Sequence, residues 1–503
     1  MCRMNRNTFA VLAAVAAASA SAASRMELRY AGYDTPDGST WHYRVVVSEA
    51  AASDPAWRAV ADALAAKYSK APFDSSVSVA NPTNALGSLI PGEQWLPTPR
   101  YVAFVMKPEE AGADTVFRLH DIMKSLDDDP FYDAVWGIVT GPTADAAMHL
   151  ATARGVHPQT ALSTTGIDFR PFDDATAILD AYAPGTRREE YMQSVKPVAV
   201  VEKRGGAAEA TRIVRGDTTA EFAAAWDALD PELVVTSAHA SQGNLEMPFS
   251  TGNIVPRKGK LWTLPKMRLI DYSTGQAAKG SKSHAARAKL AAPKRDKIWI
   301  AAGNCLIGDY KGNDSMAAAI IGYARAVQFM GYVKTTWFGE IGWESLGQFM
   351  NNRASAGEAW YFAGQNLERK LALMKKDEND IRYAGRIWDR DATILWGDPA
   401  LDASLEEGRL RQPAKLTGLR TRGGIALTFE ALEDLEAKED KVEEVRIVHP
   451  FGIILPRAPR PYEVKTASAL GVFAADDFAL VTSWPSMKKG EKAEVILRVP
   501  GGR

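Results

Sequence analysis

Short apolar runs alternate with helix-like stretches along the first 400 residues of the chain. The runs YVAFVM at 101–106 and AVWGIVT at 134–140 have the character of strands, and a helical pattern at 115–126 lies between them. Nearly continuous apolar strands separated by helices are typical of a parallel sheet covered on both faces. The pattern therefore predicts an α/β fold for this part of the chain.

A second series of the same kind begins near residue 195. Its predicted elements are strands at 195–201, 233–236, 298–302 and 332–337, with helices at 219–229 and 315–330. A polar, basic stretch at 273–297, which we interpret as a solvated loop, interrupts the series. We expect two α/β layers side by side, with an N-terminal subdomain at 24–193 and a second subdomain at 194–411.

The character of the sequence changes beyond residue 411. Short strands between Pro, Gly and charged turns are predicted at 425–429, 445–448, 452–455, 479–482 and 493–497. Such spacing is typical of a small all-β sandwich. We therefore expect a third unit at 412–503.

The N-terminus has the layout of a secretory signal peptide. Arg3 and Arg6 precede an apolar run from Phe9 to about Ala18, and small residues with Ala-x-Ala spacing follow. A membrane anchor is the alternative, but the run is shorter than the roughly 20 residues that a spanning helix needs. We expect residues 1–23 to be removed and the protein to be secreted, periplasmic or on the cell surface, with no later segment inserted in a membrane.

The charge balance and the cysteine count exclude several classes of binding partner and of covalent cross-link. The 503 residues include 60 basic and 61 acidic side chains, so no net field would collect nucleic acid or anionic lipid. Of the two cysteines, Cys2 lies in the predicted signal peptide, which leaves Cys305 alone and excludes an internal disulfide. Apolar residues make up 46% of the chain, enough for ordinary hydrophobic cores.

Two predicted strands end in residues that are able to react. The strand at 233–236 continues through Ser-Ala into His239, and the strand at 298–302 continues through Gly303 and an asparagine into Cys305. If the strands are neighbours in a parallel sheet, both side chains stand on the same edge. A histidine within hydrogen-bond reach activates a thiol, and the pair can attack a carbonyl carbon to form a thioester. The N–H groups of Cys305 and Ala240 are the candidate donors to the oxyanion.

Each of these residues has a plainer interpretation. Most free cysteines are small buried hydrophobes, and a histidine at a strand end is often only hydrogen-bonded. The turn-forming residues on both sides of Cys305 are a poor context for an inert core residue. No other histidine has metal-ligand spacing, so no metal site is predicted. The motifs GxSxG, HExxH, CxxC, GxGxxG and the Walker loop are also missing from the sequence.

The segments VVTSAHAS around His239 and IAAGNCLIGDY around Cys305 resemble the gingipain family of caspase-like cysteine peptidases. The resemblance continues in the same order with SMAAAI at 315–320, TWFGEIGW at 336–343 and ILWGDPAL at 394–401. It implies a caspase-like three-layer sandwich of two side-by-side subdomains with mainly parallel sheets. It also implies an immunoglobulin-like domain after residue 411.

The resemblance further implies an exported cysteine endopeptidase with Cys305 as nucleophile and His239 as its proton-transfer partner. Proteins and peptides would be the substrates, and no cofactor is required. Trp343 is carried over as a wall of the substrate pocket, and Trp337 competes for the same role. A structural calcium ion has no support in the sequence.

The chain departs from the family pattern at two places. The family's glycine after the histidine is Ala240 here, which would strain the oxyanion loop if that position required a positive φ. The region that carries the family's arginine-binding aspartate offers only Glu202 and Glu209, so a preference for arginine or lysine is not carried over. Two alternatives stay open: a catalytically inactive caspase-fold protein that binds partners at the cell envelope or surface, and acyl transfer or peptide ligation by the same dyad.

Overall fold

The computed structural model describes most of the chain beyond residue 40. The described residues are 41–70, 73–79, 99–180, 197–265, 270–271, 276–277, 288–352, 354–374, 380–406, 408–409, 412–421, 424–442, 450–466 and 469–499. The predicted signal peptide at 1–23, the predicted strand at 445–448 and most of the basic stretch lie outside them. Within these ranges, no helix combines the length and the apolar character needed to cross a membrane.

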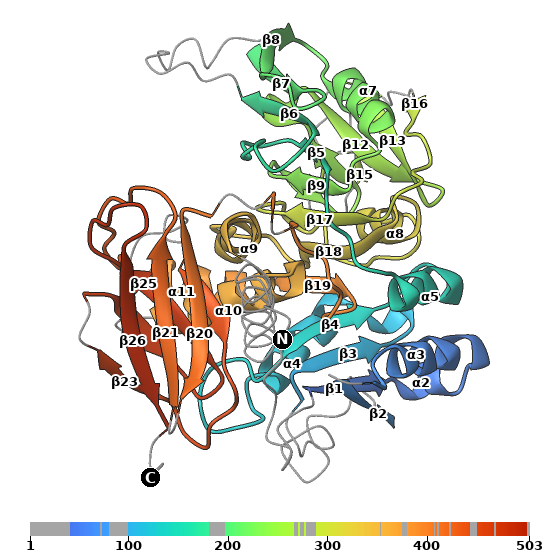
Figure 1. The fold of residues 1–503 in the computed structure, drawn as a ribbon. Helices are drawn as coiled ribbons and strands as arrows, with labels where there is room; N and C mark the ends of the chain where they lie inside the picture. Colours follow the sequence, from blue (N-terminus) through green and yellow to red (C-terminus); the bar gives the residue numbers. More distant parts are fainter. Residues whose placement is uncertain are drawn as a thin grey trace, which may run out of the picture.

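A large, mainly parallel sheet forms the centre of the molecule (Figure 1). In spatial order its twelve described strands are β2 (Phe73–Val79), β1 (Trp41–Val47), β3 (Tyr101–Val105), β4 (Val135–Val139), β19 (Thr393–Gly397), β18 (Ala326–Tyr332), β17 (Lys297–Ala301), β9 (Leu233–Thr236), β5 (Thr160–Ser163), β6 (Asp174–Asp180), β7 (Pro197–Lys203) and β8 (Ala210–Arg215). The central strands are buried on both faces, which explains their continuous apolar runs. The prediction of an α/β fold with a mainly parallel sheet is confirmed.

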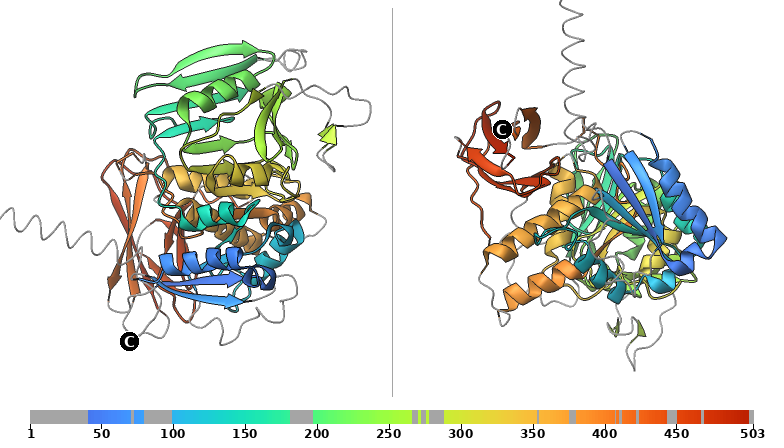
Figure 2. Two further views of the ribbon diagram at one scale, coloured as in Figure 1. Left: turned by 90° about the vertical axis from the view of Figure 1, so that its right-hand side faces the viewer. Right: turned by 90° about the horizontal axis from the view of Figure 1, so that it is seen from below.

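Helices cover both faces of this sheet (Figures 1 and 2). They are α2 (Glu49–Ala52), α3 (Pro55–Lys67), α4 (Ala113–Ile122), α5 (Ala144–Thr152), α7 (Thr219–Leu229), α8 (Met316–Gly322), α9 (Glu340–Asn351), α10 (Ala356–Leu373) and α11 (Ile381–Asp391), with 3-10 turns η2 (Pro108–Glu110) and η3 (Pro248–Ser250). Helices α3, α5 and α8 lie on one face, and α9 and α10 lie on the other. The predicted layering of helices on a sheet is therefore present.

Small antiparallel strands fill the connection between β9 and β17. They are β10 (Ala240–Ser241), β11 (Asn244–Glu246), β12 (Gly252–Arg257), β13 (Lys260–Pro265), β14 (Ile270–Asp271), β15 (Gln276–Ala277) and β16 (Ala288–Lys289). The first of them, β10, starts directly after His239. The hairpin of β10 and β11 therefore holds the histidine from its C-terminal side.

The C-terminal region consists of antiparallel strands. One sheet contains β20 (Ala414–Thr421), β21 (Gly424–Ala431), β26 (Lys492–Arg498) and β23 (Glu463–Thr466), and the other contains β22 (Phe451–Ile454), β25 (Phe478–Ser483) and β24 (Gly471–Ala474). Phe429, Phe451 and Trp484 pack together between them. These strands stand beside α10 and α11 (Figure 1).

The sheet does not divide at the boundary predicted near residue 193. Strands β5 and β6 precede that residue, yet β5 pairs in parallel with β9 and β6 pairs with β7. In the other half, β4 pairs with β19. Strands from before and after residue 193 therefore alternate along one continuous sheet.

The predicted helix at 315–330 and strand at 332–337 are wrong in part, because α8 ends at Gly322 and β18 spans Ala326–Tyr332. A Cβ atom at Gly322 would lie 2.6 Å from a carbon of Pro142, so a larger residue does not fit there. Arg325 turns the chain with φ of 58° and its guanidinium binds Asp296. The apolar residues that follow are compatible with a strand or a helix. They form a strand because they pair with β17 on one side and with β19 on the other.

A buried carboxylate, that of Asp398, links the end of β19 to β1 and α3. Asp398 lies in the segment ILWGDPAL at 394–401, and both of its carboxylate oxygens accept hydrogen bonds. Oδ1 accepts from the Tyr43 hydroxyl at 2.8 Å, and Oδ2 accepts from the Tyr68 hydroxyl at 2.6 Å and from Lys67 Nζ at 2.7 Å. Asp398 has no exposed surface. The segment is therefore tied to β1 and α3.

We expect Tyr68→Phe to lower the free energy of unfolding by about 1.5–3 kcal/mol, because a buried carboxylate loses a charge-assisted donor. Urea unfolding followed by circular dichroism measures this loss. Tyr310→Phe is the matched control, since the Tyr310 hydroxyl is buried without a hydrogen-bond partner among the described residues. That variant should change stability by less than about 0.5 kcal/mol. Equal losses in the two variants would contradict the role given to the Asp398 network.

Candidate active site

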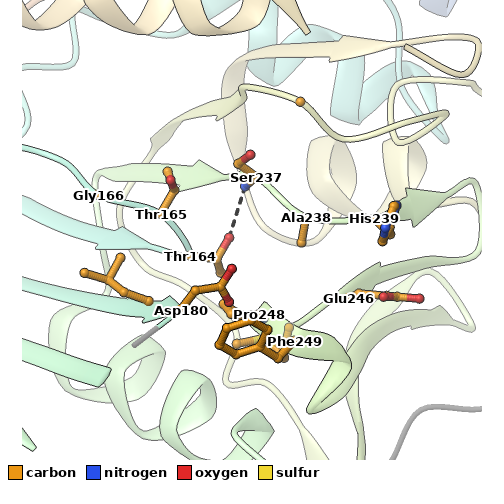
Figure 3. A pocket seen from close by; sticks show the side chains of 13 residues that line it. Thr164, Thr165, Gly166, Asp180, Ser237, Ala238, His239, Glu246, Pro248 and Phe249 are labelled. Atoms are coloured by element: carbon orange, nitrogen blue, oxygen red, sulfur yellow. Dashed lines mark hydrogen bonds between the residues drawn. The ribbon is translucent and has the colours of Figure 1, made fainter. Parts of the chain in front are cut away.

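His239 lies just past the carboxyl end of β9. The strand ends at Thr236, and the N–H of Ser237 donates to the Thr164 hydroxyl at 3.1 Å, which fixes the start of the loop (Figure 3). The His239 carbonyl accepts from the N–H of Glu246 at 2.9 Å, which fixes the end of the loop. The residue itself is exposed. A loop held at both ends thus presents the imidazole to solvent.

Cys305 lies in the corresponding place after β17. The strand ends at Ala301, and Gly303 and Asn304 lead into a turn that contains the cysteine. Cys305 is partly exposed, whereas Asn304 is fully buried. The interpretation of Cys305 as an inert residue of a closed core does not fit this partly exposed position in a turn.

The two loops are joined directly. Strands β9 and β17 are parallel neighbours, with Thr236 opposite Ala301. The Asn304 amide donates to the Ala238 carbonyl at 2.7 Å, and its oxygen accepts from the Thr236 hydroxyl at 2.7 Å. The residue before Cys305 is thereby bonded to the residue before His239. The predicted placement of both side chains on one edge of the sheet follows from this geometry.

The thiol and the imidazole are not hydrogen-bonded to each other in this structure. The Cys305 thiol donates instead to the Thr336 carbonyl, with an Sγ–O distance of 3.9 Å. Burial raises the pKa of the Cys305 thiol, and the charge of Asp389 raises this pKa further. The resting thiol is therefore protonated at neutral pH, and a base is needed to make it a nucleophile.

A strained residue follows the cysteine. Leu306 adopts φ of 57°, a left-handed conformation that costs a residue with a side chain about 1–2 kcal/mol. Its N–H donates to the Lys334 carbonyl at 3.1 Å, and the N–H of Gly308 donates to the Tyr332 carbonyl at 3.0 Å. These contacts hold the turn against the end of β18 and the segment that follows it. Strain of this kind collects where a side chain must be presented in a fixed direction.

Ala240, the second predicted oxyanion donor, is buried in β10. It pairs with Leu245 and is absent from the residues with positive φ. Alanine therefore causes no backbone strain at this position, and the strain considered from the sequence is not present. The replacement of the family's glycine does not by itself argue against catalysis.

Trp343 lies in the first turn of α9 and reaches back over the loop that leads to Cys305. A Cβ atom at Gly303 would lie 3.4 Å from Trp343 Nε1 and 3.4 Å from Ser237 Oγ. Trp343 is partly buried, whereas Trp337 is 54% exposed in the loop between β18 and α9. Both tryptophans accordingly belong to elements that border the cysteine turn.

A cavity of about 600 Å³ opens beside the His239 loop (Figure 3). Its wall includes the loop from Ser237 to His239, the segment from Glu246 to Phe249, the segment from Thr164 to Gly166, the end of β6 at Leu179 and Asp180, and Gly303. In Figure 3 the Asp180 carboxylate, Pro248 and Phe249 face the His239 loop across this space. Cys305 and Trp343 do not line the cavity, which reaches the cysteine turn only at Gly303.

Sequence reasoning missed two carboxylates of this cavity and one next to the thiol. Asp180 is the last residue of β6, a strand inside the sheet, and Glu246 lies in a short hairpin strand; neither place carries a recognisable motif. Asp389 lies in α11, more than 80 residues after Cys305. Their approach to the site depends on strand order and helix packing. Only the strand-end position of Asp180 was a usable signal in the sequence.

No family model matches the chain, and no curated protein matches it. Solved structures that are similar to it include one described as the structure of a protease, which aligns over 93% of this chain and 96% of that chain with 11% identity and a TM-score of 0.38. Another is the Arg-specific cysteine proteinase gingipain R, aligned over 92% of both chains with 9% identity and a TM-score of 0.40. Likeness at this level carries no argument about chemistry, which rests on the geometry of the site itself.

Proposed function

We propose that the chain is an exported, gingipain-like cysteine endopeptidase with a caspase-like fold and an immunoglobulin-like C-terminal domain. The observation that carries this proposal is the hydrogen bond between Asn304 and Ala238, which joins the ends of β9 and β17 beside a cavity. A single partly exposed thiol and an exposed imidazole on adjacent strand ends are the two groups that thiol-dependent acyl transfer requires.

In the proposed reaction, His239 accepts the proton of the Cys305 thiol as Sγ bonds to the carbonyl carbon of the substrate. The N–H groups of Cys305 and Ala240 stabilise the oxyanion. The imidazolium then gives its proton to the leaving amine as the C–N bond breaks, which leaves a thioester. Water hydrolyses the thioester and restores the thiol. This chemistry needs no cofactor, and residues 1–23 would direct the enzyme out of the cytoplasm.

The proposed reaction requires the thiol to change its hydrogen-bond partner on substrate binding. In the resting structure the thiol points to the Thr336 carbonyl, so it must rotate toward the imidazole when substrate enters. Catalytic hydrogen bonds are often formed only in the complex with substrate. The absence of strain at Ala240 favours an active enzyme over an inactive surface-binding protein, which is the second candidate function.

The carboxylates of the cavity suggest the class of substrate side chain. Asp180 and Glu246 both line it, and a cleft with one sign of charge concentrates groups of the opposite sign. We therefore propose that peptides with a cationic side chain next to the cleaved bond are preferred. Trp343 lies outside this cavity, beside Gly303, and we propose it as an apolar wall of the substrate pocket on the side of the cysteine turn.

Labelling with a thiol-directed peptidyl ketone tests the proposal. The wild-type protein is incubated with two such probes, one carrying arginine and one carrying leucine next to the reactive group, and the modified residue is identified by mass spectrometry. We expect both probes to modify Cys305, with the arginine probe reacting several-fold faster. The reason is that binding in the site supplies orientation that a free thiol lacks.

The control for this experiment is the same protein unfolded in urea. Its thiol is more accessible, yet it should react with the two probes at equal rates. Labelling of folded Cys305 that is no faster than labelling of the unfolded chain would refute the proposal and favour the surface-binding alternative. Peptide cleavage in the presence of an added amine separates hydrolysis from acyl transfer, because a ligase would yield the amide of that amine.

A further inference from the structure

A buried carboxylate in α11 holds the loop that faces the cysteine. Asp389 has no exposed surface, and four donors from residues 336–339 bind it. Its Oδ1 accepts from the Thr336 hydroxyl at 2.8 Å and from the Trp337 N–H at 2.6 Å. Its Oδ2 accepts from the N–H groups of Phe338 at 2.7 Å and Gly339 at 2.8 Å. A single side chain therefore satisfies three successive backbone donors.

This loop, residues 336–339, contacts the nucleophile turn and leads into α9. The Thr336 carbonyl accepts a hydrogen bond from the Cys305 thiol, with an Sγ–O distance of 3.9 Å. The Lys334 carbonyl accepts one from the Leu306 N–H, with an N–O distance of 3.1 Å. Gly339 has φ of 66° and forms the N-terminal cap of α9, the helix that carries Trp343. A shift of the loop would therefore move the partner of the thiol and the tryptophan together.

We propose that Asp389 is a positioning residue for the reaction of Cys305, because it fixes the 336–339 loop as one wall beside the thiol. The inference rests on the proposed function for its catalytic meaning. A carboxylate that accepts backbone N–H groups at a helix start is usually the N-cap residue of that helix, whereas Asp389 comes from a different helix, α11, and is buried. Its negative charge also acts on the thiol directly, since no cation is bonded to it among the described residues.

The other charged groups around Asp389 are already paired or neutral. On α9, Glu340 is bound by Lys370 at 2.6 Å and by Arg386 at 2.9 Å. On β18, the buried Tyr332 hydroxyl accepts from the Gly342 N–H at 2.9 Å, and burial raises the pKa of this phenol well above its usual range. The charge of Asp389 also raises the pKa of the Cys305 thiol. The charge of Asp389 should therefore be visible in the titration of the thiol.

The substitutions Asp389→Asn and Asp389→Glu separate charge from geometry. Asparagine removes the charge and replaces one acceptor by a donor that faces backbone N–H groups. We expect kcat/KM for peptide cleavage to fall about 10²-fold, the cost of misplacing a site by roughly 1 Å. The rate of Cys305 alkylation by iodoacetamide should rise at a lower pH than in the wild type, because a negative neighbour raises a thiol pKa and is now absent. Glutamate keeps the charge but displaces the loop, so kcat/KM falls and the alkylation profile stays.

Asp380→Asn is the matched control, since Asp380 lies on the same helix but caps its exposed N-terminus. This variant should keep both the alkylation profile and kcat/KM. If Asp389→Asn does not fold, Thr336→Val removes the hydroxyl that bridges Asp389 and Gly339 with little change of shape. It should lower kcat/KM and the peptidyl-probe labelling rate about tenfold, a loss of about 1.4 kcal/mol.

Alkylation does not require peptidase activity, so the two proposals can fail separately. If the wild type cleaves no peptide, the proposed function fails, and the alkylation profile alone decides whether Asp389 acts on the thiol. An unchanged profile and unchanged kcat/KM in a folded Asp389→Asn protein would overturn the inference. Loss of activity without any shift of the thiol titration would also overturn the direct effect of the charge, since a merely structural role predicts that pattern.

Discussion

His239→Ala is expected to lower kcat/KM for peptide cleavage by about 10²–10⁴-fold, because the thiol loses its general base and the leaving amine its general acid. The effect should be large at neutral pH in particular. Burial raises the pKa of the Cys305 thiol, so little thiolate exists there without a base. Cleavage of a fluorogenic peptide over a range of pH measures the loss. Raising the pH should restore part of the activity of the variant by ionising the thiol directly.

Cys305→Ala should abolish thioester chemistry, and the double variant should be no worse than Cys305→Ala alone. Residues that act as one unit show this lack of additivity. His157→Ala is the matched control, since His157 is a partly exposed histidine in the loop before β5, bonded to the Ser404 carbonyl at 3.0 Å. It should leave kcat/KM unchanged. Independent, additive losses for His239 and Cys305 would contradict a shared catalytic step.

The strands that carry this pair were predictable because their sequence signals are local. LVVT and IWIA are buried, apolar and bounded by turn residues, so β9 is predicted at its observed bounds and β17 within one residue. Their adjacency was only a condition of the sequence argument, because strand order depends on how distant segments pack. The hydrogen bond from Asn304 to the Ala238 carbonyl joins the loops that carry Cys305 and His239. It could not be predicted from the sequence of either segment alone.

Asp389 illustrates why other parts of the site could not be predicted from the sequence. In the sequence it belongs to RIWDRD, which has the pattern of a solvated, charged helix face. Its partners lie about 50 residues earlier and are backbone N–H groups, which leave no signature in side-chain chemistry. The β10 and β11 hairpin next to His239 was missed for a related reason: its strands are too short to show a period of two.

Arg457→Met is expected to lower the free energy of unfolding by about 3–5 kcal/mol, the usual cost of removing one partner from a buried ion pair. The Arg457 guanidinium reaches from the C-terminal region into the loop before β4. It binds Asp127 at 3.1 Å and the Asp133 carbonyl at 2.6 Å, and it also binds Asp476 at 3.4 Å and Asp477 at 3.1 Å. Arg100, itself fully buried, shares Asp477 at 3.0 Å. Without Arg457, Arg100 is the remaining arginine bonded to this group of carboxylates among the described residues, and its partner in the group is Asp477.

Arg58→Met in α3 is the matched control, because the Arg58–Asp62 pair is largely exposed on both sides. Exposed pairs of this type contribute little, so this variant should lose less than about 1 kcal/mol. Urea unfolding of both variants, followed by tryptophan fluorescence and by circular dichroism, gives the comparison. Similar losses in the two variants would show that the Arg457 cluster does not hold the C-terminal region to the sheet.

The carboxyl groups around Arg457 also predict how the free energy of unfolding changes with pH. Burial, followed by neighbouring carboxylates, raises the pKa of Asp133 to about 9, and burial together with Asp477 raises the pKa of Asp476 to about 8. A carboxyl group whose pKa is higher in the folded state than in the unfolded state favours folding at low pH, and this contribution is lost as pH rises from about 4 through the folded pKa. Stability should therefore fall between about pH 5 and about pH 9.

The Arg457→Met variant should show a steeper fall over the same range. The guanidinium lowers the pKa of both Asp133 and Asp476, so its removal shifts these groups further toward the protonated form in the folded state. At about pH 5 most of the cluster is protonated and the variant should lose least, whereas at about pH 9 the unfolded chain releases protons that the folded one retains and the loss is greatest. A difference between variant and wild type that is the same at both ends of the range would mean that Arg457 stabilises the interface through packing alone and not through these charges.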